Sequence, residues 1–434
     1  MIPTPLLRRI CLVGLVTPAL ACVPLAAAEA TPVPSPTSTP AASATSVVGF
    51  WAGEVTSAPQ GSQSDDSTAY YDPADRSALT SAVWDVLKKN HVPLYLNMRY
   101  GRDFGPVPAG VHSDAASLVR KANGLGVPVI AWIVVPSDKG YWAYEGNAPT
   151  MTDAVKAWAS WKNAERLRFA SVALDQEFSS QNLRTYTTDL TGGKLGELAV
   201  WMNGNIDPAK QCKALRDYRD LISWAHDRGI AVTAAEAPMV VDDLHDGNLA
   251  LQDALDIAGS SPGYDQTYLM AYRSGVAESG VDPGSAYVSS YYTDMQKYFG
   301  KGGQASLGVG GQKPYDTLTP LVDDVRMLAG LGARQIPIYS LESTVGKFGA
   351  AGLQTIVEAA SHPMKGSELT EATKPTALSE GFRVPNYLLD ATATALTFTA
   401  TAKQGHLQGP NSWPNGCGDL AARPLAHHQS ADGQ

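Results

Sequence analysis

Short runs rich in β-branched and aromatic residues recur along the chain from residue 47 to about residue 362. Runs of this length and composition are typical of strands buried on both faces. We therefore predict eight strands, over residues 47–54, 92–101, 127–137, 169–178, 231–239, 265–275, 305–311 and 335–343.

Longer amphipathic stretches separate these runs and predict helices. They cover residues 75–90, 112–125, 153–167, 212–228, 287–299 and 317–330. Several end at a glycine, such as Gly126, Gly229 and Gly332, which readily takes the left-handed conformation that closes a helix. Strands and helices that alternate in this way predict a single-domain α/β fold, the closed (β/α)8 or TIM barrel. The alternative is an open doubly wound sheet, but the first strand is not followed by the glycine-rich phosphate turn of such folds.

The N-terminal segment has the pattern of an export signal, with Arg8 and Arg9 before an uncharged apolar run over 10–21. We predict a signal peptide over 1–30. Two cleavage sites fit: a lipoprotein site before Cys22, whose lipid would anchor the chain to a membrane, or an ordinary site near Ala28. Residues 31–46 are almost entirely Thr, Pro, Ser and Ala and predict a solvated linker. The expected location is therefore extracellular, either secreted or tethered at the cell surface.

The barrel is expected over 47–362, followed by a partly disordered C-terminal extension over 363–434. Cys212 and Cys417 are the cysteines that remain after either cleavage, and in an oxidising compartment we expect them to form a disulfide. The net charge is −9, and no stripe of Lys and Arg is present. Nucleic acid is therefore not an expected partner. No second apolar segment is long enough to span a membrane, and we expect a monomer.

The working groups of a (β/α)8 barrel project from the C-terminal ends of its strands. The predicted strand ends carry an unusual concentration of carboxylates together with polar and aromatic groups. These are Glu54, Asn97, Arg99, Trp132, Asp175, Glu177, Glu236, Tyr272, Arg273 and Glu342. Buried carboxylates are costly unless they are paired or protonated. The carboxylates therefore indicate either a catalytic site or structural ion pairs with Arg99 and Arg273.

Asp175 and Glu177 are the most specific feature of this set. Residues two apart on a strand point to the same side, so the two carboxyl groups should lie together and push their pKa values apart. A carboxyl group that holds a proton near neutral pH can deliver it to a glycosidic oxygen. We predict that Glu177 is the general acid, with Glu342 or Glu236 favoured as the second carboxylate and Asp175 and Glu54 as alternatives.

The strand-four Asp-x-Glu, together with Leu-Met-Ala-Tyr over residues 269–272, resembles the family 18 chitinases. This resemblance implies that Glu177 is the acid, that Asp175 orients the substrate acetamide and that Tyr272 supports the same group. The chain departs from the family at three positions where the family has Asp: Ala170, Ala173 and Arg273. It also lacks the family's strand-eight Trp. The Asp-x-Glu is similar as well to that of the family 25 lysozymes, whose strand-one Asp is missing here.

Aromatic side chains could stack on sugar rings, and the candidates are Trp51, Trp132, Tyr141, Trp142 and Tyr144. Asn97, Arg99 and Glu54 are the polar candidates for substrate binding. No histidine lies at a predicted strand end, so we expect neither a catalytic metal nor any other cofactor. The sequence therefore predicts a glycoside hydrolase that acts on a cell-wall or extracellular polysaccharide. The alternative is a non-catalytic barrel that binds a surface glycan.

Overall fold

The computed structural model of the chain describes residues 46–53, 78–107, 109, 113–179, 181–182, 185–186, 194–259, 263–277 and 280–403. The predicted signal peptide and nearly all of the predicted linker lie outside these residues. Glu54 and Cys417 also lie outside them, so the site role of Glu54 and the pairing of Cys417 stay predictions. Cys212, which is buried in a helix, is disulfide-bonded.

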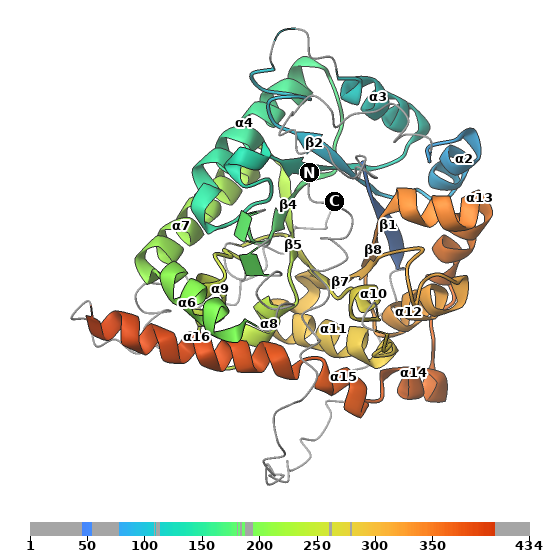
Figure 1. Cartoon of the computed structure of the whole chain (residues 1–434). Helices are drawn as coiled ribbons and strands as arrows, with labels where there is room; N and C mark the ends of the chain where they lie inside the picture. The colour runs from blue at the N-terminus through green and yellow to red at the C-terminus, as the bar shows by residue number, and fades with distance from the viewer. Residues whose placement is uncertain are drawn as a thin grey trace.

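Eight parallel strands form a closed barrel in the order in which they occur along the chain (Figure 1). They are β1 (Val47–Ala52), β2 (Leu94–Arg99), β3 (Val129–Val134), β4 (Ser171–Gln176), β5 (Ala231–Glu236), β6 (Gln266–Met270), β7 (Gly303–Gly308) and β8 (Gln335–Tyr339). This closure confirms the predicted (β/α)8 fold. Each strand lies within its predicted run, except that β7 begins two residues earlier.

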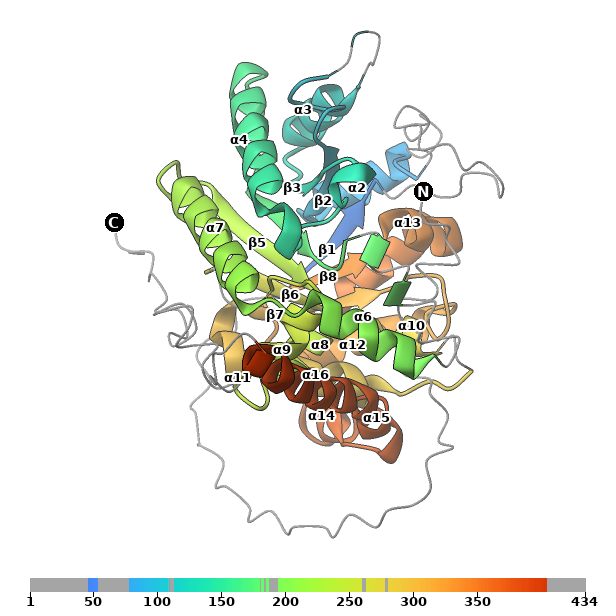
Figure 2. The same ribbon diagram turned by 60° about the vertical axis from the view of Figure 1, so that its left-hand side comes forward.

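Helices surround the barrel, as both ribbon views show (Figures 1 and 2). They are α2 (Ser81–Lys89), α3 (Ala115–Leu125), α4 (Ala148–Ala164), α6 (Leu195–Asn205), α7 (Pro208–His226), α8 (Met239–Asp243), α9 (Ala250–Ala254), α10 (Arg273–Ala277), α11 (Ser285–Phe299), α12 (Leu318–Gly330) and α13 (Leu341–Ala359). Short 3-10 turns are η3 (Ser137–Lys139), η4 (Glu145–Asn147) and η5 (Gly300–Gly302). Local sequence explains where α7 begins: the Asp207 carboxylate accepts the N–H groups of Ala209 and Lys210, and Pro208 occupies the first turn.

The two sides of the barrel wall have different neighbours because strand side chains alternate. Outward-facing aliphatic residues pack against the helices. Inward-facing residues form a separate cluster that is rich in aromatic rings. At the N-terminal end of the strands, the Tyr95 hydroxyl lies 2.8 Å from the Tyr268 hydroxyl and 3.0 Å from Gln335 Oε1. This network occupies the barrel interior at that end, and catalytic groups of (β/α)8 barrels lie at the opposite, C-terminal end of the strands.

Three helices of the C-terminal extension continue beyond the predicted barrel boundary at residue 362. They are α14 (Gly366–Thr373), α15 (Ala377–Gly381) and α16 (Val384–Lys403), and α16 packs along α6, α8 and α9 (Figure 2). The Arg383 guanidinium donates to the buried Asp242 carboxylate of α8 at 3.0 Å and to Asp294 at 2.6 Å. Asn386 donates to the other Asp242 oxygen at 2.7 Å. The part of the extension up to residue 403 is thus a helical layer on the barrel, where the sequence had predicted no helix or strand.

None of the described helices is both long and apolar enough to cross a membrane.

Candidate active site

Asp175 and Glu177 lie together at the C-terminal end of β4. Asp175 pairs in register with Ala235, which belongs to the inward-facing cluster, so Asp175 faces the barrel interior and Glu177, two residues on, shares that side. Their carboxyl groups are hydrogen-bonded to each other. The two side chains are only 5 % and 7 % exposed. The structure therefore brings the predicted pair together in a nearly closed environment.

Burial raises the pKa of both carboxyl groups. It raises the pKa of Glu177 to about 7, against the opposing effect of the hydrogen bond from Asp175. The pKa of Asp175 is raised well above its usual range, first by burial and then by the neighbouring Glu177 charge. Ionising both groups would place two negative charges side by side in a site with little water. The pair consequently retains a proton near neutral pH, as a general acid requires.

Several buried polar atoms around the pair have no hydrogen-bond partner among the described residues. They are Trp51 Nε1, Asn97 Nδ2, Trp132 Nε1 and Asp175 Oδ1, from the neighbouring strands β1 to β4. Asn97 and Trp132 are direct register partners. Buried donors and acceptors are nearly always satisfied in folded proteins, so a group of unsatisfied ones on adjacent strands indicates a place for a polar ligand.

Aromatic rings continue this surface around the barrel interior. Trp51 packs edge-on against Trp132 at 5.3 Å between ring centroids, and Trp132 packs in the same way against Tyr339 at 6.4 Å. Tyr339 then stacks on Tyr272 at 5.9 Å. Tyr141 lies against the same cluster from the loop after β3. Tyr339 was not among the predicted site residues, although its place at the end of β8 and strand alternation could have identified it.

Trp132→Phe is expected to raise KM about tenfold while changing kcat less than threefold, because it removes one unsatisfied donor but keeps an aromatic ring. The measurement is KM and kcat of the variant and the unmodified protein on a glycan that the unmodified protein converts. Trp158→Phe is the matched control, since Trp158 is also buried with an unpartnered Nε1 but lies in α4. Equal effects of the two changes would contradict a ligand-binding role for Trp132.

Arg99 and Glu342 occupy the same end of the barrel. Arg99 follows Tyr95 and Asn97 on the inward side of β2, and its Nε lies 3.3 Å from Asn97 Oδ1. The Glu342 carboxylate accepts the N–H of Gly53, just after β1, at 2.6 Å. Glu342 lies in the first turn of α13 rather than on the predicted strand, because β8 ends at Tyr339. Both residues remain candidates for substrate contact or catalysis.

Glu236 lies on the opposite side of the barrel wall from the carboxylate pair. It pairs in register with Gln176 and Leu269, which face the helices, whereas Ala235 beside it faces the interior. Its carboxyl carbon lies close to Gly259 in the connection before β6. Burial raises the pKa of Glu236 to about 8. The structure thus contradicts the predicted partnership of Glu236 with Glu177, because the strand itself separates them.

Trp142 and Arg273 are also placed away from the carboxylate pair. Trp142 is 5 % exposed and belongs to the core between barrel and helices, because its loop folds back onto β4 and turns the ring outward. It is therefore not positioned to stack on a sugar as predicted. Arg273 begins α10 and pairs with Asp282 at 2.6 Å and Asp324 at 2.9 Å. The sequence had suggested that Arg273 pairs with carboxylates at the strand ends, and neither Asp282 nor Asp324 is one of those.

Within the described parts of the chain, no group of three or more His, Cys, Asp or Glu side chains is arranged to hold a metal ion.

No family model matches the chain, and no curated protein matches its sequence. Among solved structures, the chain is similar to the glycoside hydrolase domain of PgaB (BpsB) from Bordetella bronchiseptica, with 16 % sequence identity and a TM-score of 0.41. The similarity covers 68 % of this chain and 96 % of that one. Because a similarity this low carries no argument about activity, we infer function from the geometry of the site.

Proposed function

We propose that this chain is a glycoside hydrolase that acts on an extracellular or cell-wall polysaccharide, with Glu177 as the general acid. Glu177 donates its proton to the glycosidic oxygen as the bond from that oxygen to the anomeric carbon breaks. Water then attacks the anomeric carbon, where its hydroxyl group completes the sugar, and its remaining proton passes to a carboxylate of the site. An extracellular substrate accords with the predicted export signal.

The observation that carries this proposal is the buried, hydrogen-bonded pair of Asp175 and Glu177 at the C-terminal end of β4. Its raised pKa values favour a carboxyl group that is still protonated near neutral pH. A buried carboxylate with a purely structural role would need a cation beside it. For Asp175 and Glu177, the causes of the pKa shifts are burial and the other carboxyl group, and no cation is among them.

The surroundings of the pair suit a sugar. The unsatisfied donors of Trp51, Asn97 and Trp132 match hydroxyl oxygens, and the exposed edges of Tyr272 and Tyr141 can contact the apolar C–H faces of a ring. Glu342 is the favoured candidate for a second carboxylate at this end of the barrel, with Asp175 as an alternative and Glu54, outside the described residues, still a prediction.

The proposal is tested by incubating the purified protein with a panel of soluble polysaccharides and cell-wall glycan fragments and measuring new reducing ends. We expect hydrolysis of at least one member, with a rate that depends on Glu177. Saturable binding of a glycan without turnover would overturn the hydrolase proposal and support the alternative, a barrel that binds glycan without cleaving it.

Asp175→Asn is expected to change the pH profile of kcat as well as lower it. With two carboxyl groups, the active form carries one proton, and the negative charge of the ionised partner helps the pair to retain that proton at high pH. The asparagine variant has a single titrating group, so its acid limb should disappear and its alkaline limb should move to lower pH. A profile identical to that of the unmodified protein would show that the two groups do not titrate together. Asp217→Asn is the control, because Asp217 lies half-buried on α7 in a surface ion pair with Lys213, away from the carboxylate pair.

A further inference from the structure

The backbone between the two carboxylates is held by a loop rather than by a neighbouring strand alone. The N–H of Ala143 donates to the Asp175 carbonyl at 2.9 Å, and the Ala143 carbonyl accepts the N–H of Glu177 at 3.0 Å. These two bonds form an isolated parallel bridge that faces Gln176. Ala143 lies in the connection between β3 and α4. The direction in which both carboxylates point therefore depends on where this connection sits.

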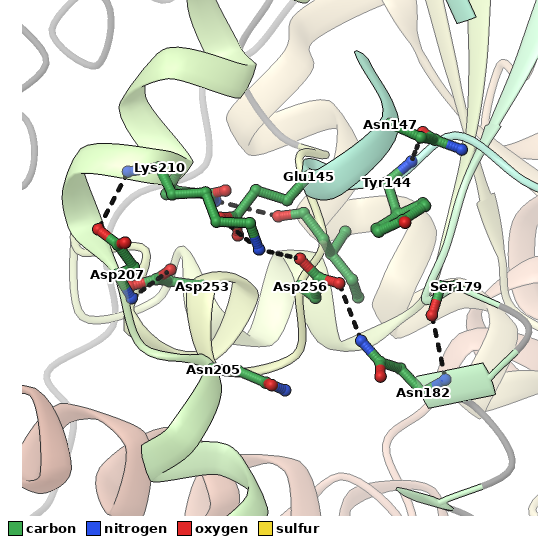
Figure 3. Close-up of polar contacts among 12 residues, drawn as sticks. Tyr144, Glu145, Asn147, Ser179, Asn182, Asn205, Asp207, Lys210, Asp253 and Asp256 are labelled. Atoms are coloured by element: carbon green, nitrogen blue, oxygen red, sulfur yellow. Dashed lines mark hydrogen bonds and ion pairs between the residues drawn. The ribbon is translucent and has the colours of Figure 1, made fainter. Parts of the chain in front are cut away.

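A network of ion pairs between two buried carboxylates and a partly exposed lysine holds the same connection (Figure 3). Lys210, in the first turn of α7, reaches between two carboxylates. Its Nζ lies 3.1 Å from Glu145 Oε1 and 2.7 Å from Asp256 Oδ1. Glu145 follows Ala143 by two residues and its side chain is fully buried, whereas Lys210 is 42 % exposed. The Glu145 N–H also donates to the Asp256 carbonyl at 3.1 Å.

The network reaches the chain on the other side of Glu177 as well. Asn182 Nδ2 donates to the second Asp256 oxygen at 2.8 Å, and the Asn182 N–H donates to Ser179 Oγ at 3.1 Å. Ser179 follows Glu177 by two residues. Asp256 is thus connected to the chain on both sides of Glu177, through the loop that contains Glu145 and through the segment that contains Ser179.

The positive charge of Lys210 is what allows these acidic groups to lie together. Among the described residues, Lys210 is the only cation paired with Glu145 or Asp256. Asp253 is also buried beside the network and accepts the N–H of Asp207 at 3.1 Å. Burial raises the pKa of Glu145 and Asp256, and the Lys210 charge opposes this in both. Without that charge, the acidic groups would have to take up protons or move apart.

We propose that Lys210 is a positioning residue for Glu177. Its ion pairs with Glu145 and Asp256 fix the connection that carries Ala143, and Ala143 fixes the backbone of both carboxylates. The structural part of this proposal stands by itself, whereas its consequence for turnover rests on the proposed hydrolase function.

Hydrogen exchange of backbone amides tests the structural part without any substrate. In Lys210→Met, the amides of Ala143 and Glu177 should exchange about tenfold faster, because the bridge that protects them opens more often. Peptides from β7 and β8 provide the internal reference and should not change. Lys210→Arg should restore protection. Lys213→Met is the matched control, since Lys213 lies on the same helix in an exposed pair with Asp217.

Unchanged exchange of both amides in Lys210→Met would overturn the proposal. Asn182→Ala provides a second test should Lys210→Met fail to fold, because it removes the donor to Asp256 and leaves the ion pairs in place. We expect about threefold faster exchange in the peptide that contains Glu177. Unchanged exchange in Asn182→Ala would equally count against the network as the support of Glu177.

Kinetics on a confirmed substrate separate this proposal from the proposed function. Lys210→Met should lower kcat about tenfold and leave KM within threefold, because the acid is displaced while the aromatic surface is kept. If amide exchange is faster in Lys210→Met but the unmodified protein hydrolyses no glycan, the hydrolase proposal is wrong and the positioning role of Lys210 stands. If the unmodified protein hydrolyses a glycan and Lys210→Met has the same kcat, only the positioning role of Lys210 is contradicted.

Discussion

Glu177→Gln is expected to lower the turnover number by a factor of about 10²–10⁴, the usual contribution of general acid catalysis. The amide has nearly the same shape as the carboxyl group, but it cannot deliver a proton to a glycosidic oxygen. It can still donate a hydrogen bond to Asp175, so the fold should be retained. The measurement is kcat for the variant and the unmodified protein on the same substrate.

Glu358→Gln is the control for this change, because Glu358 lies on α13 in an exposed position 3.7 Å from Lys89. Its turnover should equal that of the unmodified protein. Glycan affinity of Glu177→Gln should also be preserved, since the aromatic residues and the unsatisfied donors provide the contacts. Turnover of Glu177→Gln at the unmodified rate would show that Glu177 is not the acid. Loss of folding would instead favour a structural role for the carboxyl group.

Glu236→Gln is expected to stabilise the protein increasingly as the pH rises from about 4 to about 8. The folded-state pKa of Glu236 is raised by burial to about 8, above the value of about 4.3 in an unfolded chain. A raised pKa contributes stability that is fully present below the unfolded value and is lost as the pH rises through the folded value. At about 1.4 kcal/mol per pKa unit, the loss is on the order of 5 kcal/mol at most.

The measurement is the free energy of unfolding in urea at pH 5 and at pH 8. The difference between Glu236→Gln and the unmodified protein should grow with pH, because glutamine does not ionise. Glu236 is suited to this test, since neither of its carboxyl oxygens has a hydrogen-bond partner among the described residues. Parallel pH dependences of the two proteins would mean that Glu236 is ionised in the folded state.

The barrel was predictable because its strands are buried on both sides and therefore read as continuous apolar runs. Glycines such as Gly126, with a φ of 73°, mark where a helix ends and the chain turns back. The placement of Asp175 and Glu177 side by side was predictable for a similar reason. It depends on the two-residue period within one strand, which is a local property of the backbone.

The position of Glu236 was not predictable in the same way. Whether the Glu236 side chain faces the barrel interior or the surrounding helices depends on the register between β4 and β5, which pairs Glu236 with Gln176. In β5, small and apolar residues occupy both sides, so the local pattern does not distinguish inside from outside. The direction of Trp142 depends on a loop that returns to bridge β4 through Ala143. Contacts between distant segments decide both cases.

The sequence did not predict the C-terminal helices. The longest of them, α16, is rich in alanine and threonine, and its apolar residues are not concentrated on one face. Its docking depends on polar groups instead. Arg383 and Asn386 satisfy the Asp242 carboxylate, which is completely buried and also accepts the Tyr291 hydroxyl at 2.9 Å.

This pairing has a consequence for the order in which the molecule is made. Asp242 leaves the ribosome about 140 residues before Arg383, since the two lie 141 positions apart. Through that interval the nascent barrel contains a carboxylate whose counter-charge has not yet been synthesised. A chain that emerges N-terminus first can therefore neutralise this carboxylate between β5 and β6 only after Arg383 has been synthesised.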